Sequence, residues 1–425
     1  MTQRPPTAGA PRFFYGWWVV AAVFVMLTVS AGLGFYNLTV FLRALSSEQG
    51  FSVSVVSGAT AAFFGVVGVA GVPLAALLTR FDPRLTIGAG AVTCGVSLAL
   101  LGRVTQVWQL YGVYCLFGLG FAASSLLPGT TLVTAWFARR RATALSVATT
   151  GLSLGGVLVT PFCAALIEDH GLPAVTPWLG VAYVAGVLPV TALLVRASPA
   201  SLGLRPDGDD EDVLGPAVAG GATRAEAVRS REFRVVTVVH LLAMVAQVGA
   251  LAHVLNLVAG RLDAGQAAAA VSVIAVSSML GRLAGGVVSL HLGTRPFAAA
   301  MLVVQGLALV VLGLGERVEV LLPAAAVFGS TVGNVLMAHP LLLSQAFGVR
   351  DYARIFSTSN LVATLGIASG PAVLGVAYDV TGGYAVPFAL ASVASVAAAG
   401  LLVATRGGAG RLAAAGGPPG QEEPA

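Results

Sequence analysis

Charged residues are scarce in this chain. Only 10% of its 425 residues are charged, and none of the 23 basic residues is a lysine. Soluble domains carry about 25% charged residues, so this composition excludes a water-facing surface of ordinary size. With 57% hydrophobic residues and a mean hydropathy of +0.89, the sequence indicates a membrane protein.

Cysteine is scarce as well, and cofactor motifs are missing. Cys94, Cys115 and Cys163 lie in apolar runs without metal-ligand spacing, which argues against a disulfide framework and a zinc site. There is no Walker loop and no polar segment long enough for a nucleotide-binding domain, so ATP-driven pumping is excluded. We expect no cofactor, no metal and no enzymatic activity. The arginines are scattered rather than gathered into a stripe, which argues against nucleic-acid binding.

What the sequence does contain is a series of long apolar runs. A helix needs about 20 residues to cross a bilayer, and twelve such runs are separated by short polar breaks. They cover residues 16–40, 53–78, 85–102, 107–135, 143–167, 174–195, 234–259, 266–290, 296–314, 318–346, 353–378 and 384–404. The first run is of spanning length and has no cleavage site, so we expect it to remain as the first span. The predicted fold is an all-α membrane protein with twelve transmembrane helices.

The arginines predict the orientation of these spans. If successive loops alternate between the two sides, eighteen arginines fall on the side of the termini. The other side then has four, namely Arg43, Arg103, Arg261 and Arg317. The positive-inside rule therefore predicts a multi-pass protein of the inner cell membrane with cytoplasmic N- and C-termini.

An internal repeat divides the chain into two halves. An offset of about 210 residues relates Pro161 and Asp169 to Pro371 and Asp379, which favours a duplicated six-helix unit. The predicted parts are an N-terminal six-helix bundle (1–196), a cytoplasmic central loop (197–233), a C-terminal six-helix bundle (234–405) and a disordered cytoplasmic tail (406–425). The central loop could contain a short helix from Thr223 to Phe233. It also carries an acidic cluster, Asp207, Asp209, Asp210, Glu211 and Asp212.

Two halves of six spans, cytoplasmic termini and a long central loop resemble the major facilitator superfamily. The superfamily loop motif G-x-x-x-D-R-x-G-x-R is retained after the second span only as Arg80 and Arg84. Its copy after the eighth span retains Gly286, Gly293 and Arg295. The resemblance implies that Arg80, Arg84 and Arg295 belong to loops that take part in conformational gating.

Three segments resemble more narrowly the monocarboxylate-porter and oxalate/formate-antiporter group, particularly its bacterial members. They are YGWW at 15–18, WFARRRATAL at 136–145 and SPASLGLRPDG at 198–208. The resemblance implies a secondary transporter that carries a small organic anion by alternating access.

Arg282 is the main candidate for substrate binding. It lies near the middle of the eighth run, where an unpaired charge costs about 3 kcal/mol on insertion scales. A guanidinium that faces a central cavity could bind a carboxylate with two parallel hydrogen bonds, as the resembled group does with an arginine in this span. The alternative is a lasting ion pair, or hydrogen bonds to backbone carbonyls of a neighbouring helix.

His253 in the seventh run is the candidate for proton coupling, because imidazole titrates near neutral pH and the resembled porters have a histidine there. A neutral histidine bonded between helices is the alternative. His240 and His339 are weaker candidates for the same role. Tyr36 and Asn37 in the first run, and Asn360 and Thr364 in the eleventh, are further candidates for substrate contact, although bonding between helices is the more frequent use of such groups.

The predicted function is secondary active transport of a small organic anion, such as a monocarboxylate, coupled to H⁺ and carried out by a monomer in the lipid bilayer without an obligate protein partner. The main alternative is an exporter of neutral or amphipathic metabolites or drugs. A membrane sensor that binds a solute without moving it is a further alternative.

Overall fold

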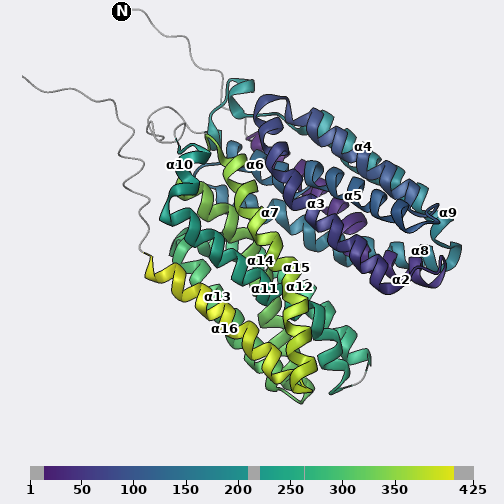
Figure 1. Cartoon of the computed structure of the whole chain (residues 1–425). Coiled ribbons are helices and arrows are strands. Elements are labelled where there is room, and N and C mark those ends of the chain that lie inside the picture. Colours follow the sequence, from purple (N-terminus) through teal and green to yellow (C-terminus); the bar gives the residue numbers. More distant parts are fainter. Residues whose placement is uncertain (1–13, 209–220, 263, 406–425) are drawn as a thin grey trace, which may run out of the picture.

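The computed structural model describes residues 14–208, 221–262 and 264–405. Within these ranges, twelve helical segments are long and apolar enough to cross a membrane, as the apolar runs predict. They form two bundles, one from each half of the chain (Figure 1). The acidic residues 209–212 and the tail 406–425 lie outside the described residues.

The N-terminal bundle contains six spans, three of which are interrupted. The first consists of α1 (Gly16–Ser30), a π-helical segment (Ala31–Tyr36) and α2 (Asn37–Ser47). The second and third are α3 (Val53–Arg80) and α4 (Pro83–Leu101), and the fourth consists of α5 (Val107–Ser124) and α6 (Leu126–Trp136). The fifth consists of α7 (Arg141–Leu154), a second π-helical segment (Gly155–Val159) and α8 (Thr160–His170), and the sixth is α9 (Leu172–Leu194).

The C-terminal bundle has six continuous helices. They are α11 (Arg231–Ala259), α12 (Ala264–Leu292), α13 (Thr294–Leu314), α14 (Val318–Phe347), α15 (Tyr352–Thr381) and α16 (Ala385–Ala404). We call the side where α1 begins and α16 ends the terminal side, and the opposite side the far side. The described residues of the central segment between the bundles, 197–208 and 221–230, lie on the terminal side.

Equivalent contacts in the two bundles support the predicted repeat. In the N-terminal bundle, Gly155 packs against the Thr28 carbonyl of the first span; in the C-terminal bundle, Gly366 packs against the Leu241 carbonyl of the seventh. Gly171 before α9 and Gly382 before α16 both have a positive φ, of 80° and 69°, which glycine adopts without steric cost, although their ψ angles of 154° and 14° differ. The two halves therefore share a helix contact as well as helix order.

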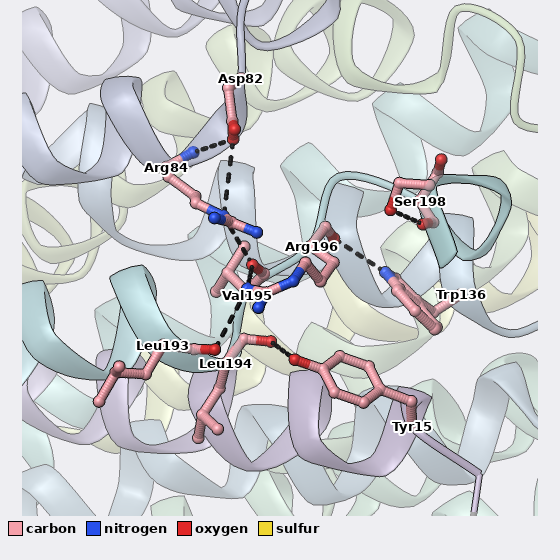
Figure 2. A network of polar contacts seen from close by, with 10 residues as sticks. Tyr15, Asp82, Arg84, Trp136, Leu193, Leu194, Val195, Arg196 and Ser198 are labelled. Atoms are coloured by element: carbon pink, nitrogen blue, oxygen red, sulfur yellow. Dashed lines mark hydrogen bonds and ion pairs between the residues drawn. The ribbon is translucent and has the colours of Figure 1, made fainter. Parts of the chain in front are cut away.

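The residues that carried the family resemblance hold the terminal side of the N-terminal bundle together (Figure 2). The carbonyls at the end of α9 accept three hydrogen bonds from side chains elsewhere in the bundle: Leu194 from the Tyr15 hydroxyl (3.1 Å), Val195 from Arg84 Nε (2.7 Å) and Arg196 from Trp136 Nε1 (3.0 Å). A helix end leaves such carbonyls unsatisfied. These side chains thus serve the scaffold.

The central segment is attached to both bundles. The Asp207 carboxylate accepts hydrogen bonds from the backbone amides of Ala138 (2.8 Å), Arg139 (2.6 Å) and Arg140 (3.1 Å), at the start of α7. Asp207 itself has a φ of 59°, which aspartate tolerates better than most residues. On the other bundle, the Ala222 amide donates to the Phe347 carbonyl at 2.9 Å, at the equivalent loop before α15.

The predicted helix from Thr223 to Phe233 is interrupted. A short helix, α10 (Arg224–Arg229), ends at Ser230, whose side chain accepts from the Phe233 amide and starts α11. Thr223 and Glu226 cap α10 reciprocally, and the Thr223 amide, by donating to the Glu226 carboxylate, lowers the pKa of Glu226. A polar N-cap residue inside the predicted helix thus divides it in two.

The apolar core joins the bundles on the terminal side. One cluster of buried residues combines Leu74, Leu78 and Leu127 of the N-terminal bundle with Val236 and Phe356 of the C-terminal bundle. Another belongs mainly to the N-terminal bundle and a third to the far half of the C-terminal bundle. In Figure 1 the bundles meet near α6, α7 and α15 and diverge toward the far side. This conformation is therefore closed on the terminal side.

Replacing Asp207 with alanine tests the attachment of the central segment. We expect Asp207→Ala to lower thermal stability in detergent, because three amides lose an anionic acceptor at a helix start, where a capping residue contributes about 0.5–2 kcal/mol. Asp207→Asn, which retains an acceptor oxygen, should lose less, and Asp169→Ala on the exposed end of α8 should match wild type. Equal melting temperatures for all four proteins would contradict this role.

Candidate functional site

Arg282 lies on α12 where this helix crosses α7 of the other bundle. Its side chain is 1% exposed. Nε donates to the Gly333 carbonyl on α14 at 3.2 Å, and Nη1 donates to the Thr149 carbonyl on α7. The backbone of Arg282 is held too, because its carbonyl accepts from the Ser146 hydroxyl of α7 at 2.5 Å. One arginine therefore links the two bundles through both its side chain and its backbone.

No carboxylate among the described residues pairs with this guanidinium, and Nη2 has no hydrogen-bond partner among them. In this conformation the charge is satisfied by backbone carbonyls, which is one of the two alternatives that the sequence left open. Carbonyl dipoles compensate a cation only in part. The guanidinium therefore retains the capacity to bind an anion, and substrate binding by Arg282 stays a prediction.

Tyr36 lies close enough to Arg282 for the two side chains to interact electrostatically. It ends the π-helical segment of the first span, and its ring packs against Gly156 in the π-helical segment of the fifth. It is 38% exposed, because the bundles diverge on the far side. Single π-helical turns occur frequently at functional sites. Tyr36 and Arg282 thus interact electrostatically across the two bundles, with no hydrogen bond between them.

Asn37 lies apart from this pair. Its side chain is 0% exposed, inside the N-terminal bundle, and neither its amide nitrogen nor its oxygen has a hydrogen-bond partner among the described residues. A neighbouring side chain is Cys163 of α8. Direct substrate contact by Asn37 therefore gains no support from its position, although the prediction is not otherwise tested.

Asn360 and Thr364 lie at the second crossing between the bundles, where α15 meets α3. Asn360 lines a cavity of about 40 Å³ together with Ser125, at the break between α5 and α6, and Ser357. The Thr364 hydroxyl donates to the Asn360 carbonyl at 2.9 Å and packs against Gly68 of α3. Asn360 is therefore placed at a mainly apolar cavity between the bundles that also has two serines in its lining, and Thr364 in a helix contact.

His253 lies within the C-terminal bundle. Its Nε2 is 3.0 Å from the Pro371 carbonyl of α15, and its ring lies 5.9 Å from that of Tyr384. No hydrogen bond or electrostatic interaction joins it to Arg282 among the described residues. The contact is the one expected of a histidine bonded between helices, and a role in proton coupling stays a prediction.

The loop arginines make their contacts inside single bundles. Arg84 donates to the Val195 carbonyl, and Arg295 donates to the Leu402 carbonyl at 3.0 Å and pairs with Glu232. Arg80 lies over the ring of the adjacent Phe81 at 5.6 Å. Arg84 and Arg295 thus fix equivalent helix ends in the two halves, and their predicted part in gating is not tested by these contacts.

The sequence reasoning did not identify three features of this region. Thr149 and Gly333 accept hydrogen bonds from Arg282 through their backbone carbonyls. Every residue type has such a carbonyl, so the sequence does not mark these two positions. Asp207 was seen only as one member of an acidic cluster. His240 and His339, the weaker histidine candidates, stack on each other with ring centroids 3.8 Å apart. Because the two histidines are far apart in the sequence, the sequence alone does not indicate that their rings stack.

Within the described residues no group of three or more His, Cys, Asp or Glu side chains could hold a metal ion. The candidate site consists of one guanidinium without a carboxylate partner among the described residues, a tyrosine and two cross-bundle helix contacts. Such an arrangement can bind an anion and respond to the relative position of the bundles.

Comparison with known proteins gives concordant matches. The sequence profile of the Major Facilitator Superfamily matches residues 24–289. Monocarboxylate transporter 13 of Bos taurus is 27% identical over 94% of this chain and 90% of its own length. Monocarboxylate transporter 11 of Mus musculus is 27% identical over 92% of this chain and 87% of its own length. The crystal structure of the human organic anion transporter MFSD10 (TETRAN) has a TM-score of 0.71 at 16% identity, covering 94% of this chain and 100% of that one, which shows a common fold.

The contact between the first and fifth spans, which positions Tyr36, can be tested with one added methyl group. A Cβ at Gly155 would lie 2.3 Å from the Thr28 carbonyl oxygen, whereas a Cβ at Gly65 would have no atom within 4 Å. We expect Gly155→Ala to lower the melting temperature in detergent, since overpacking costs about 1–3 kcal/mol. Gly65→Ala should leave it unchanged or raise it slightly. Equal stability of the two variants would contradict the close packing.

Proposed function

The chain belongs to the Major Facilitator Superfamily, and on that premise we propose that it is a secondary active transporter of a small organic anion with one carboxylate. As a member of this superfamily it is a multi-pass membrane transporter and not an enzyme. The proposal concerns its cargo, its coupling and its orientation. The names of the two mammalian relatives support the cargo class.

The observation that carries the proposal is the unpaired charge of Arg282. Burying a cation without a counter-ion is unfavourable, and retaining one at the crossing of the bundles calls for a compensating role. A carboxylate that enters from the far side would find a guanidinium beside Tyr36 and could bind it with charge-assisted hydrogen bonds. An uncharged cargo would gain far less from this site.

The number of cations favours one carboxylate over two. Arg282 is the one arginine in the described part of the chain that is buried. A second carboxylate on the same cargo would therefore enter without a second guanidinium and would lose its hydration without an equivalent partner. A single buried guanidinium in the described part of the chain therefore favours monocarboxylates over dicarboxylates as cargo.

Binding at Arg282 can also drive the conformational change. The guanidinium now donates to the Thr149 carbonyl of the opposite bundle, in a conformation that is closed on the terminal side. A bound carboxylate competes for the same donors. Exchanging the carbonyl for the carboxylate would weaken the α7–α12 crossing and favour rocking of the bundles about the site, as alternating access requires.

We further propose that the terminal side is cytoplasmic, in the inner cell membrane, because the arginine-rich loops lie there. The transporter is proposed to act as a monomer and to couple transport to H⁺. Export of neutral or amphipathic compounds is the competing function, and it predicts little dependence on Arg282.

Uptake into proteoliposomes tests the proposal. Radiolabelled lactate, pyruvate and acetate would be compared with a dicarboxylate and a neutral solute, with and without an inward proton gradient. Hydrogen bonds to charged groups contribute about 1.5–3 kcal/mol, so Arg282→Gln should lower kcat/KM for the transported acid by about 10- to 100-fold. Arg282→Lys should retain part of the activity, because it retains the charge but not the planar pair of donors.

Arg43→Gln, on the exposed end of α2, is the control and should behave as wild type. Uptake of an acid that is unchanged in Arg282→Gln would contradict the proposed binding role. Uptake of the neutral solute alone would favour the exporter.

A further inference from the structure

His240 and His339 form a buried pair on the terminal half of the C-terminal bundle. His240 lies on α11 and His339 on α14, and their rings stack with centroids 3.8 Å apart and planes 12° from parallel. The side chains are 7% and 3% exposed. No contact joins this pair to Arg282 or His253 among the described residues, so it forms a separate polar site.

A chain of hydroxyl groups extends from the pair. His339 Nε2 lies 2.8 Å from the Ser359 hydroxyl of α15, and this hydroxyl lies 2.8 Å from that of Thr237 on α11. A cavity of about 20 Å³ with an apolar lining adjoins both rings. The pair thus has a polar network on one side and an apolar cavity on another.

The remaining surroundings are apolar. The cavity is lined from α11 by Val236, Val239 and Ala243, from α13 by Ala298 and Leu302, and from α14 by Val335, Ala338 and Leu342; Phe356 of α15 packs on His339.

The ionisable residues of the adjoining elements are Arg231, Glu232, Arg234 and His253 on α11, Arg282 and His291 on α12, Arg295 on α13, Glu319 on α14, Tyr352, Arg354, Tyr378 and Asp379 on α15, Tyr384 before α16, and Arg80 on α3. Within the described residues, His240 is the one ionisable group that acts electrostatically on His339, and none acts on His240.

We infer that the His240–His339 pair is the site that binds the coupling proton, while Arg282 binds the anion. This inference rests on the proposed function. Imidazole is the side chain that ordinarily changes charge between about pH 5 and pH 8. Two imidazolium ions at this separation would repel each other strongly in an apolar interior. The pair can therefore hold at most one proton.

Protonation would be transmitted through Ser359. In a neutral imidazole, Nε2 can donate or accept, but in the imidazolium ion both ring nitrogens donate. The Ser359 hydroxyl must then accept from His339 and turn its own hydrogen toward Thr237. Ser359 lies on α15, which crosses the opposite bundle where Thr364 meets Gly68 and Ser357 faces Gly71. A change in the protonation of the pair thus reaches Ser359, which lies about one helix turn from a contact that keeps the terminal side closed.

Three matched variants test the inference in proteoliposomes. His240→Gln and His339→Gln remove one ring each, and His253→Gln is the control at the alternative candidate. Two rates are measured for a transported monocarboxylate: exchange against internal cargo without a pH gradient, and accumulation driven by the gradient.

We expect both pair variants to retain exchange within about threefold of wild type and to lose gradient-driven accumulation by at least about tenfold. His253→Gln should retain both activities. Gradient-driven accumulation that persists in both pair variants, or that is lost in His253→Gln alone, would overturn the inference.

A second measurement does not depend on cargo or on the folding of the variants. In wild-type protein labelled with [¹³C]histidine and placed in nanodiscs, the Cε1 resonances of His240 and His339 should shift together as one proton binds while the pH is lowered from about pH 8 to the lowest value at which the protein stays folded. Resonances that stay in the neutral form throughout this range would overturn the inference. A joint titration in a protein that exchanges none of the acids would support the proton site and contradict the proposed cargo.

Discussion

The structure around the midplane depends on one buried guanidinium. Arg282 has no carboxylate partner among the described residues, and its charge is satisfied by carbonyls of two helices, one of them in the opposite bundle. Its side chain passes so close to Gly333 that a Cβ there would lie 2.9 Å from Nε. This one side chain takes part in both the α12–α14 contact and the α7–α12 crossing. A change in what the guanidinium binds must therefore change how the two bundles meet.

The two contacts between the bundles differ in chemistry. The α7–α12 crossing is polar and contains Ser146, Thr149 and Arg282. The α3–α15 crossing depends on small and apolar residues and has the cavity at Asn360 beside it. Anion binding would act directly on the first crossing, and protonation of the histidine pair on the second through Ser359. Two ligands acting on separate contacts of one closed conformation give a physical basis for coupling, because each shifts the same equilibrium.

The sequence predicted the helices well and their irregularities poorly. Apolar runs located every span, since crossing a bilayer requires a long run of apolar residues, and Arg282 stood out because it is a charge within such a run. The π-helical segments and the break at Ser125 have no residue signature, and acceptors such as the Thr149 carbonyl belong to the backbone. The His240–His339 stack required two helices that are far apart in sequence to pack together. The prediction of one continuous helix from Thr223 to Phe233 was wrong, because Ser230 was not recognised as an N-cap.

The central claim is that the charge of the cargo is what Arg282 recognises. The most direct measurement is isothermal titration calorimetry of the purified protein with short monocarboxylates and with their amides, which have nearly the same shape but no charge. The account predicts heat of binding for an acid and none for its amide at the same concentrations. Equal binding of an acid and its amide would contradict it.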